Sequence, residues 1–393
     1  MQFIASFSAL CAVFSLGVTA SAATPVVTNV VASQRAGAKL VDIRYDVFDG
    51  DGDTLKVRVE VSHDGGITYF VPAFSLSGDV GSDITPGTNK LIVWNAGLDW
   101  DGEFSTQMRA KVIASDGRGF PGMQWGLEVA PGGFLLGQGG GPEGTGPASH
   151  VSIPYSYWLS KHEITVEQYA EFLNAAIASR DVVRVGSQIL SSTNSLAGIP
   201  AQTPVCSLGN DIQWVLTKFV AIPANTKLPI AVNWYGALAF AQFYGYDLPT
   251  DAEWEKAARG SAHDGLSEHL SYPWGNSITH ANANYEGGGR TPVGFYNGTQ
   301  SPAGPDMGNA YALYDIAGNV AEWTRTRFIE SDVYPSIENV EHEIHSLAQP
   351  GGRSLRGGSY VHSFDWLQCY RREGPLRESN PGFYGFRVVR RQR

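Results

Sequence analysis

Apolar and polar side chains alternate through much of the first hundred residues, which is the two-residue period of half-buried β-strands. The alternation is clearest in 41–47 and 55–61, where every second residue is aliphatic or aromatic. The acidic stretch 49–53 lies between them and predicts a turn, so we expect a β-hairpin. Alternation returns at 107–114, and the pattern indicates about seven strands in all. We therefore expect residues 24–121 to form an all-β sandwich of the immunoglobulin-like or fibronectin type.

The acidic turn has a partial likeness to a calcium-binding loop. Four carboxylates match positions 1, 3, 5 and 12 of an EF-hand: Asp49, Asp51, Asp53 and Glu60. However, Thr54 stands where that loop requires glycine, and the residues after it alternate as a strand instead of entering a helix. We expect a solvated turn, with a looser calcium contact as the alternative.

A helical period appears after a glycine-rich stretch at 131–147. Three helices are predicted, at 165–178, 234–243 and 248–260. In the third, Thr250 and Glu253 are spaced for a capping box and Gly260 is placed to end the helix. The remaining sequence indicates loops and short strands, so we expect a second domain, of the α+β class, over residues 122–393.

Composition limits the possible partners. The 393 residues include 28 basic and 38 acidic side chains, and the net charge of -10 disfavours nucleic acid. The 46 glycines and 21 prolines are typical of a turn-rich fold. Long helices should therefore be few.

The N-terminus has the pattern of a signal peptide. An apolar run at 3–18 is followed by Ala-Ser-Ala at 20–22, so we expect residues 1–23 to be removed and the protein to be secreted or periplasmic. An uncleaved anchor is the alternative. No later segment resembles a membrane span, which predicts that the protein is not an integral membrane protein. After removal of residues 1–23, Cys206 and Cys369 would be the remaining cysteines, and an oxidising compartment could join them in a disulfide.

Candidate chemistry concentrates near the C-terminus. Residues 315–323 read D-I-A-G-N-V-A-E-W, and their carboxylates could converge on a hard cation such as calcium. R-G-G-S-Y follows at 356–360 and G-F-R-V at 385–388. Together these motifs resemble the formylglycine-generating enzyme family, also called sulfatase-modifying factors.

The resemblance extends over about 122–390, with the motifs in the order of the family. Further matches are F-L-L-G at 134–137, S-K-H-E-I-T at 160–165, V-N-W at 232–234 and Y-P-W-G-N at 272–276. It implies a variant of the C-type-lectin fold with little regular secondary structure.

The resemblance also implies calcium. In the family the G-N-x-x-E-W loop is a calcium site, and its ligands here would be Asp315, Gly318, Val320 and Glu322. The alternative is a turn in which Glu322 pairs with a nearby arginine. A second family site would begin at Asn284 and Tyr285, although the segment that should complete it is shortened here to 286–290.

Oxidase members of the family convert a cysteine of C-x-P-x-R sequences into formylglycine, using dioxygen and copper(I) held by two cysteines. Cys369 and Arg371 match the second cysteine and the arginine after it, and Ser359 is retained. The first cysteine is missing. Its place falls at His362 when counted from Ser359, or at Phe364 when counted from Cys369. A pair of Cys369 and His362 could still hold copper, but one soft ligand instead of two predicts poor affinity.

Other features also count against an oxidase. Ala321 and Phe383 replace a tryptophan and an asparagine that line the oxidase pocket in the enzymes this chain resembles. Arg371 could equally brace the fold by pairing with a buried carboxylate. The sequence E-H-E-I-H at 341–345 is one residue short of a zinc motif, and we expect a solvated polar loop there.

Two functional hypotheses follow. The first is an exported binding or accessory protein whose lectin-like domain holds a polypeptide or glycan. The second is a divergent oxidoreductase acting on a protein or peptide, which includes formylglycine-generating activity.

Overall fold

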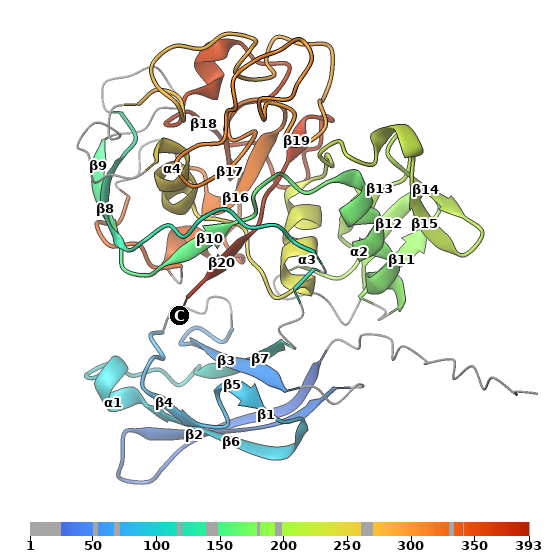
Figure 1. Cartoon of the computed structure of the whole chain (residues 1–393). Helices are drawn as coiled ribbons and strands as arrows, with labels where there is room; N and C mark the ends of the chain where they lie inside the picture. The colour runs from blue at the N-terminus through green and yellow to red at the C-terminus, as the bar shows by residue number, and fades with distance from the viewer. Residues whose placement is uncertain are drawn as a thin grey trace, which may run out of the picture.

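The computed structural model describes residues 25–49, 54–66, 71–115, 119–120, 122–138, 148–178, 181–192, 199–260, 270–329, 334–340 and 342–392. Two parts follow one another along the chain, an N-terminal part made mostly of strands and a larger mixed part (Figure 1). The predicted signal peptide lies outside the described residues.

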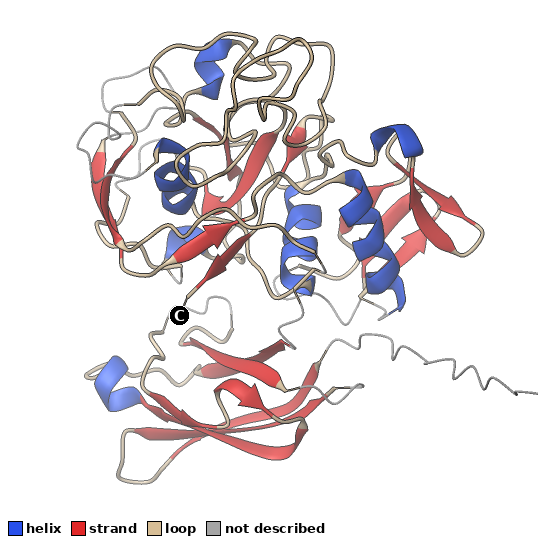
Figure 2. Ribbon diagram, viewed as in Figure 1, coloured by secondary structure: helices blue, strands red, loops and turns tan. Residues whose placement is uncertain are grey.

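The N-terminal part consists of two antiparallel sheets around one apolar core (Figure 2). Its elements are β1 Val26–Gln34, β2 Leu40–Phe48, β3 Leu55–Ser62, β4 Leu76–Gly78, β5 Gly81–Ile84, β6 Gly87–Asn95, α1 Ala96–Asp99 and β7 Arg109–Ser115. The sheet orders are β1-β2-β6-β4 and β5-β3-β7. Ile43 and Trp94 from one sheet and Val57 and Val112 from the other are buried in the shared core. The strand number agrees with the sequence pattern, and an immunoglobulin-like origin stays a prediction.

The expected hairpin between 41–47 and 55–61 is wrong. Strand β2 pairs with β1 and β6, whereas β3 pairs with β5 and β7, so the two strands lie in different sheets. Alternation shows which side chains of a strand are buried, but it does not choose the partner strand. In the acidic turn, Asp51 and Asp53 lie outside the described residues. Glu60 forms ion pairs with Arg58 and Lys111 on the sheet surface.

In its described residues, the larger part mixes short strands with three helices and long loops. Its strands are β8 Gly132–Leu136, β9 Ser149–Ile153, β10 Tyr157–Leu159, β11 Val182–Val185, β12 Gln188–Ser191, β13 Pro204–Ser207, β14 Ile212–Val215, β15 Lys218–Ala221, β16 Ala321–Arg327, β17 Arg353–Arg356, β18 Arg372–Glu373, β19 Tyr384–Gly385 and β20 Val389–Arg391. Its helices are α2 Val166–Ala178, α3 Trp234–Phe243 and α4 Asp251–Arg259, with 3-10 turns η1 Pro223–Asn225, η4 Glu343–His345 and η5 Phe364–Leu367. Among the described segments, no helix is long and apolar enough to cross a bilayer.

The three predicted helices are confirmed. The capping box of α4 forms as expected: Glu253 N donates to Thr250 Oγ1, and Thr250 N donates to the Glu253 carboxylate. Gly260 ends the helix with a φ of +90°, in the region that favours glycine. Every residue of α4 is buried, so this short helix carries charged side chains into the interior.

The central sheet, in the order β18-β17-β16-β19, brings the C-terminal motifs together (Figure 1). Strand β16 pairs antiparallel with β17, which places Glu322 opposite Arg356. It pairs parallel with β19, which places Glu322 opposite Gly385. Segments distant in sequence thus meet at Glu322.

The connection between the two parts is anchored to the larger one. Phe120 is buried in the main core of the larger part and contacts Phe240 and Tyr244. The end of the linker is therefore a packed element of the second part.

Candidate functional site

A buried ion pair joins Glu322 and Arg387 where the motifs meet. Arg387 Nη2 donates to Glu322 Oε1 at 2.7 Å, and Nε donates to Oε2 at 2.7 Å. Trp254 Nε1 from α4 donates to the same Oε2 at 2.7 Å. The other donors of Arg387 reach the carbonyls of Ser160 and Tyr314. Because the guanidinium is so fully satisfied, the pair is stable although both side chains are at most 1% exposed.

Two more buried carboxylates lie within electrostatic reach of Arg387. Asn319 Nδ2 donates to Glu163, and Gly294 N donates to Asp315 Oδ2. Burial, together with the charges of Asp315 and Glu322, raises the pKa of Glu163 well above its usual range. Burial raises the pKa of Asp315 to about 6. Three carboxylates thus surround one arginine, and a proton or a cation must neutralise the excess charge.

The loop fits the predicted calcium ion in part. Asp315 Oδ1 is buried and has no hydrogen-bond partner in the part of the chain that the structure describes. Gly318 has a φ of +89°, and a Cβ there would lie 2.4 Å from the Asn284 carbonyl oxygen. Glu322, in contrast, is the partner of Arg387, which is the alternative that the sequence left open. A calcium ion would take Asp315 as side-chain ligand, and Glu322 would join it only by releasing Arg387 or Trp254.

At the second predicted calcium site, Asn284 and Tyr285 contact other parts of the protein. Asn284 Nδ2 donates to the Gly289 carbonyl at 2.9 Å and to Asn319 Oδ1 at 3.3 Å. The ring of Tyr285 stacks on His280, with 4.1 Å between the ring centres. Asn284 therefore ties the shortened segment to the calcium loop, and a second ion there stays a prediction.

The structure holds His362 in one tautomer. Ser359 N donates to His362 Nδ1 at 3.0 Å, and Nε2 lies 3.4 Å from Glu373 Oε1. Since a backbone N–H only donates, Nδ1 is the acceptor and Nε2 carries the hydrogen toward Glu373. Neither ring nitrogen then offers a lone pair to a metal. Ser359 Oγ is also 3.0 Å from Nδ1, but Ser359 is 0% exposed, so this Ser–His–Glu arrangement positions His362 and does not present a nucleophile.

The predicted copper ligand Cys369 is sealed in the core. Its side chain is 0% exposed, and burial raises the pKa of the thiol to about 12. Cys206 lies in a different core cluster, where burial also raises its pKa to about 12. Both cysteines are free thiols. A protonated thiol and a histidine without an available nitrogen do not fit copper(I).

Beside these residues lies an aromatic cluster at the surface, made of Tyr360, His362, Trp366 and Phe383. His362 stacks on Trp366 and meets Phe383 edge to face, with 5.7 and 5.6 Å between ring centres. The guanidinium of Arg371 lies 4.1 Å from the centre of the Trp366 ring. Arg371 is thus a packing partner of the cluster. Two exposed apolar side chains lie next to the aromatic cluster in sequence, Val361 and Phe364.

Sequence reasoning missed several residues of the site. The sequence alone gives no partner for Arg387, Glu163 or Trp254. The available signal was the G-F-R-V motif of the family, to which Arg387 belongs. The expectation of a solvated loop at 341–345 is wrong at His345. That side chain is 0% exposed, and its Nε2 lies 3.0 Å from the buried Glu338.

The comparisons with known proteins agree with the motifs. The profile of the sulfatase-modifying factor enzyme 1-like domain matches residues 121–392. The chain belongs to this family. The Thermomonospora curvata formylglycine-generating enzyme is 30% identical over 299 residues, covering 67% of this chain and 93% of that enzyme.

Other known proteins resemble the chain over a similar stretch. The serine/threonine-protein kinase pkn1 of Chlamydia caviae is 32% identical over 267 residues, covering 67% of this chain. The match spans only 37% of that relative's length. The structure of PvdO from Pseudomonas aeruginosa aligns with a TM-score of 0.45 and 18% identity, over 67% of this chain and 93% of that one.

Proposed function

We propose that this member of the sulfatase-modifying factor family is an exported binding or accessory protein, which holds a polypeptide or glycan at the aromatic cluster. The proposal is carried by the residues that this chain has at the position of the oxidase copper site. Where oxidase members would need a thiolate pair, this chain has a hydrogen-bonded His362 and a buried, protonated Cys369. The aromatic rings around His362 remain partly exposed.

The character of the cluster supports binding. Aromatic faces pack on the apolar faces of sugars and on peptide side chains, and they lose little conformational entropy when they do so. The Arg371 guanidinium packs on the Trp366 ring and Glu373 lies beside His362, so charged side chains border the rings. Because Ser359 and Glu373 fix the orientation of His362, the surface is ordered before a ligand arrives.

Calcium has a structural role in this proposal. An ion at Asp315 would neutralise the excess negative charge beside Arg387 and hold the loop 315–320. That loop donates to and accepts from the segment that carries Tyr360, since Tyr360 N donates to the Asn319 carbonyl and Gly318 N to the Gly357 carbonyl. A calcium ion there would order the binding surface without taking part in chemistry.

The test of binding uses the chain from residue 24, screened against a random peptide library and a glycan array. A ligand obtained from either should lose at least tenfold in affinity with Trp366→Ala or Phe383→Ala, because each change removes a large buried contact. Phe104→Ala is the matched control, since Phe104 is 85% exposed in the N-terminal part. Absence of any ligand, or ligands that are insensitive to both substitutions, overturns the proposal.

A further inference from the structure

Two neighbouring β-hairpins in the larger part have the same turn with different residues. In the hairpin of β11 and β12, Val185 pairs with Gln188, which leaves a two-residue turn that begins at Gly186. In the hairpin of β14 and β15, Val215 pairs with Lys218, and the turn begins at Leu216. The φ angles are +63° at Gly186 and +55° at Leu216. This first turn position is the one that such hairpins usually give to glycine.

Leu216 has no structural reason to replace glycine. A bulky side chain at positive φ is strained and persists only where the surrounding structure holds it there. Leu216 is 90% exposed and is the most exposed large apolar residue described. Strained residues that stabilise nothing in the fold are characteristic of functional positions.

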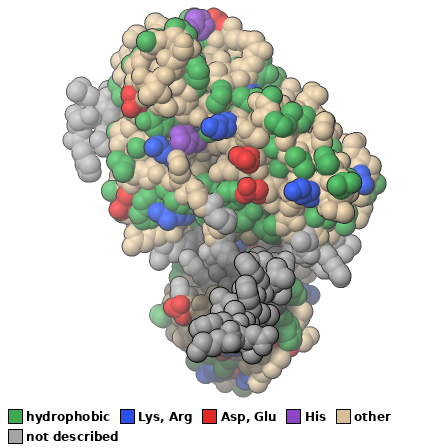
Figure 3. Space-filling view, turned by 45° about the vertical axis from the view of Figure 1, so that its right-hand side comes forward, with side chains coloured by type: hydrophobic (Ala, Val, Ile, Leu, Met, Phe, Trp, Pro, Cys, Tyr) green, Lys and Arg blue, Asp and Glu red, His purple; other side chains and the backbone are tan. Residues whose placement is uncertain are grey.

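The two hairpins present their apolar residues together. The guanidinium of Arg184 lies 5.0 Å from the centre of the Trp214 ring, which links the strand before one turn to the strand before the other. Next to these residues, Val185 is 57% and Val215 is 45% exposed. Figure 3 brings this side of the molecule forward, and apolar and basic side chains adjoin at its right-hand edge.

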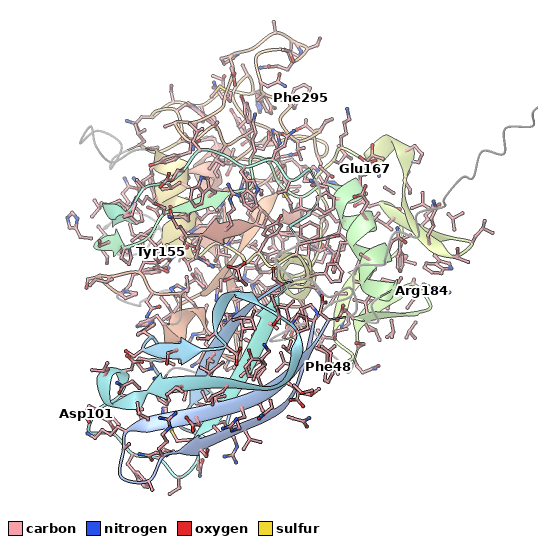
Figure 4. All side chains as sticks on the ribbon, turned by 60° about the horizontal axis from the view of Figure 1, so that its bottom comes forward. Phe48, Asp101, Tyr155, Glu167, Arg184 and Phe295 are labelled. Carbon is pink, nitrogen blue, oxygen red and sulfur yellow. The ribbon has the colours of Figure 1, made fainter. Side chains whose placement is uncertain are left out.

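The charges of the hairpins differ from those of the whole protein. The twenty residues of 182–191 and 212–221 include Arg184 and Lys218 and contain no acidic residue. The acidic residues just before them are not available, because Asp181 is 6% exposed and Asp211 pairs with Arg290 at 2.7 Å. In Figure 4, Arg184 lies well apart from Glu167 at the start of α2. A local charge of +2 thus accompanies the exposed aliphatic residues in a chain of net charge -10.

We propose that these hairpin tips insert Leu216, Val215 and Val185 into the surface of a membrane that contains anionic lipid. Aliphatic side chains would enter the boundary between headgroups and acyl chains, and Trp214 has the ring that favours this boundary. Arg184 and Lys218 would contact lipid phosphates. Neither attraction is strong alone, so the contact is weak and reversible and needs both. It is independent of the ligand site at the aromatic cluster.

Cosedimentation with vesicles tests the proposal, using the chain from residue 24. Binding is expected to vesicles of phosphatidylcholine with phosphatidylglycerol and to be much weaker with phosphatidylcholine alone. Lys218→Glu should weaken binding about fivefold or more, since each basic residue near an anionic surface contributes about 1 kcal/mol. Leu216→Gly should weaken it about tenfold, through loss of a leucine that the lipid would bury.

The glycine in the other hairpin provides a gain-of-function test. Leu216→Gly should not lower the melting temperature, because it relieves the strained backbone, so loss of binding cannot come from unfolding. Gly186→Leu should strengthen binding at some cost in stability, since a Cβ at Gly186 would meet no atom within 4 Å but would stand at a φ of +63°. Leu376→Gly is the control at another exposed leucine, 64% exposed, and should not alter vesicle binding. Equal affinity of Leu216→Gly and the unsubstituted chain, binding without anionic lipid, or a dimer that Leu216→Gly dissociates would each overturn the proposal.

Discussion

Arg387 and Glu322 are held together by hydrogen bonds from Nε and Nη2 of the arginine, in a place where neither side chain meets solvent. The pair connects β16 with the segment before β20, and Trp254 adds a bond from α4. The G-N-x-x-E-W and G-F-R motifs are therefore one structural unit. Their presence identifies the fold of the family, and it does not identify an oxidase.

Breaking this pair should destabilise the protein severely. Arg387→Met leaves Glu322 buried beside Glu163 without a countercharge, and we expect a loss of about 3–5 kcal/mol in the free energy of unfolding. Urea denaturation measures it. Arg35→Met, which breaks the surface ion pair with Asp42, is the control and should have a much smaller effect. Equal effects of the two substitutions would show that the buried pair is not a structural centre.

Calcium should stabilise the protein through Asp315. At a hundredfold excess over its dissociation constant, calcium should add about 2.7 kcal/mol to the free energy of unfolding. Asp315→Asn should abolish this dependence, and in chelator it should be at least as stable as the unsubstituted chain, since the amide removes a buried charge. Differential scanning calorimetry with calcium or chelator measures both effects. If calcium does not change the melting temperature of the unsubstituted chain, a proton, and not a cation, neutralises the carboxylates beside Arg387.

Acid should destabilise the protein through His162. Burial, with the charges of Arg387 and Lys161, lowers the pKa of His162 to about 4. The unfolded chain binds this proton near pH 6.5 and the folded chain only near pH 4, so stability is lost as the pH falls between these values. The loss should reach up to about 3 kcal/mol. His162→Gln should flatten this part of the profile, while a substitution of the exposed His150 should leave it unchanged.

Both cysteines should resist thiol reagents in the folded protein. Cys206 and Cys369 are buried, with thiols whose pKa is raised to about 12, so little thiolate exists near neutral pH. Ellman's reagent should find almost no reactive thiol in native protein and should find both in denaturant. Failure to find them in denaturant without reductant would indicate a disulfide, and rapid labelling of the native protein would refute the burial of Cys369.

The helices were predictable because their signals are local. The cap and stop of α4 lie within the segment 250–260, and no distant residue is needed to interpret them. The pairing of β2 and β3 was not predictable in this way, since alternation carries no information on the partner strand. The burial of His345 likewise depends on Glu338 and Thr326, which come from other segments.

The candidate site, like the fold, was predictable only in part from the sequence. The motifs 315–323 and 385–388 predict the location, and the sequence allows a pairing of Glu322 with an arginine but does not identify Arg387 as that arginine. Glu322 could contact either calcium or an arginine. The choice depends on the register of β16 with β19, which only the structure shows. The role of Leu216 was invisible in sequence, because a leucine in a turn becomes unusual only once its positive φ is known.

The proposed function requires that this scaffold binds a ligand and does not oxidise a cysteine. The most direct measurement is mass spectrometry of a C-x-P-x-R peptide incubated with dioxygen and the copper-treated chain from residue 24. We expect no conversion of its cysteine to formylglycine, because Cys369 is buried and His362 has no free ring nitrogen. Conversion that disappears in Cys369→Ser would contradict the account and establish a divergent oxidase.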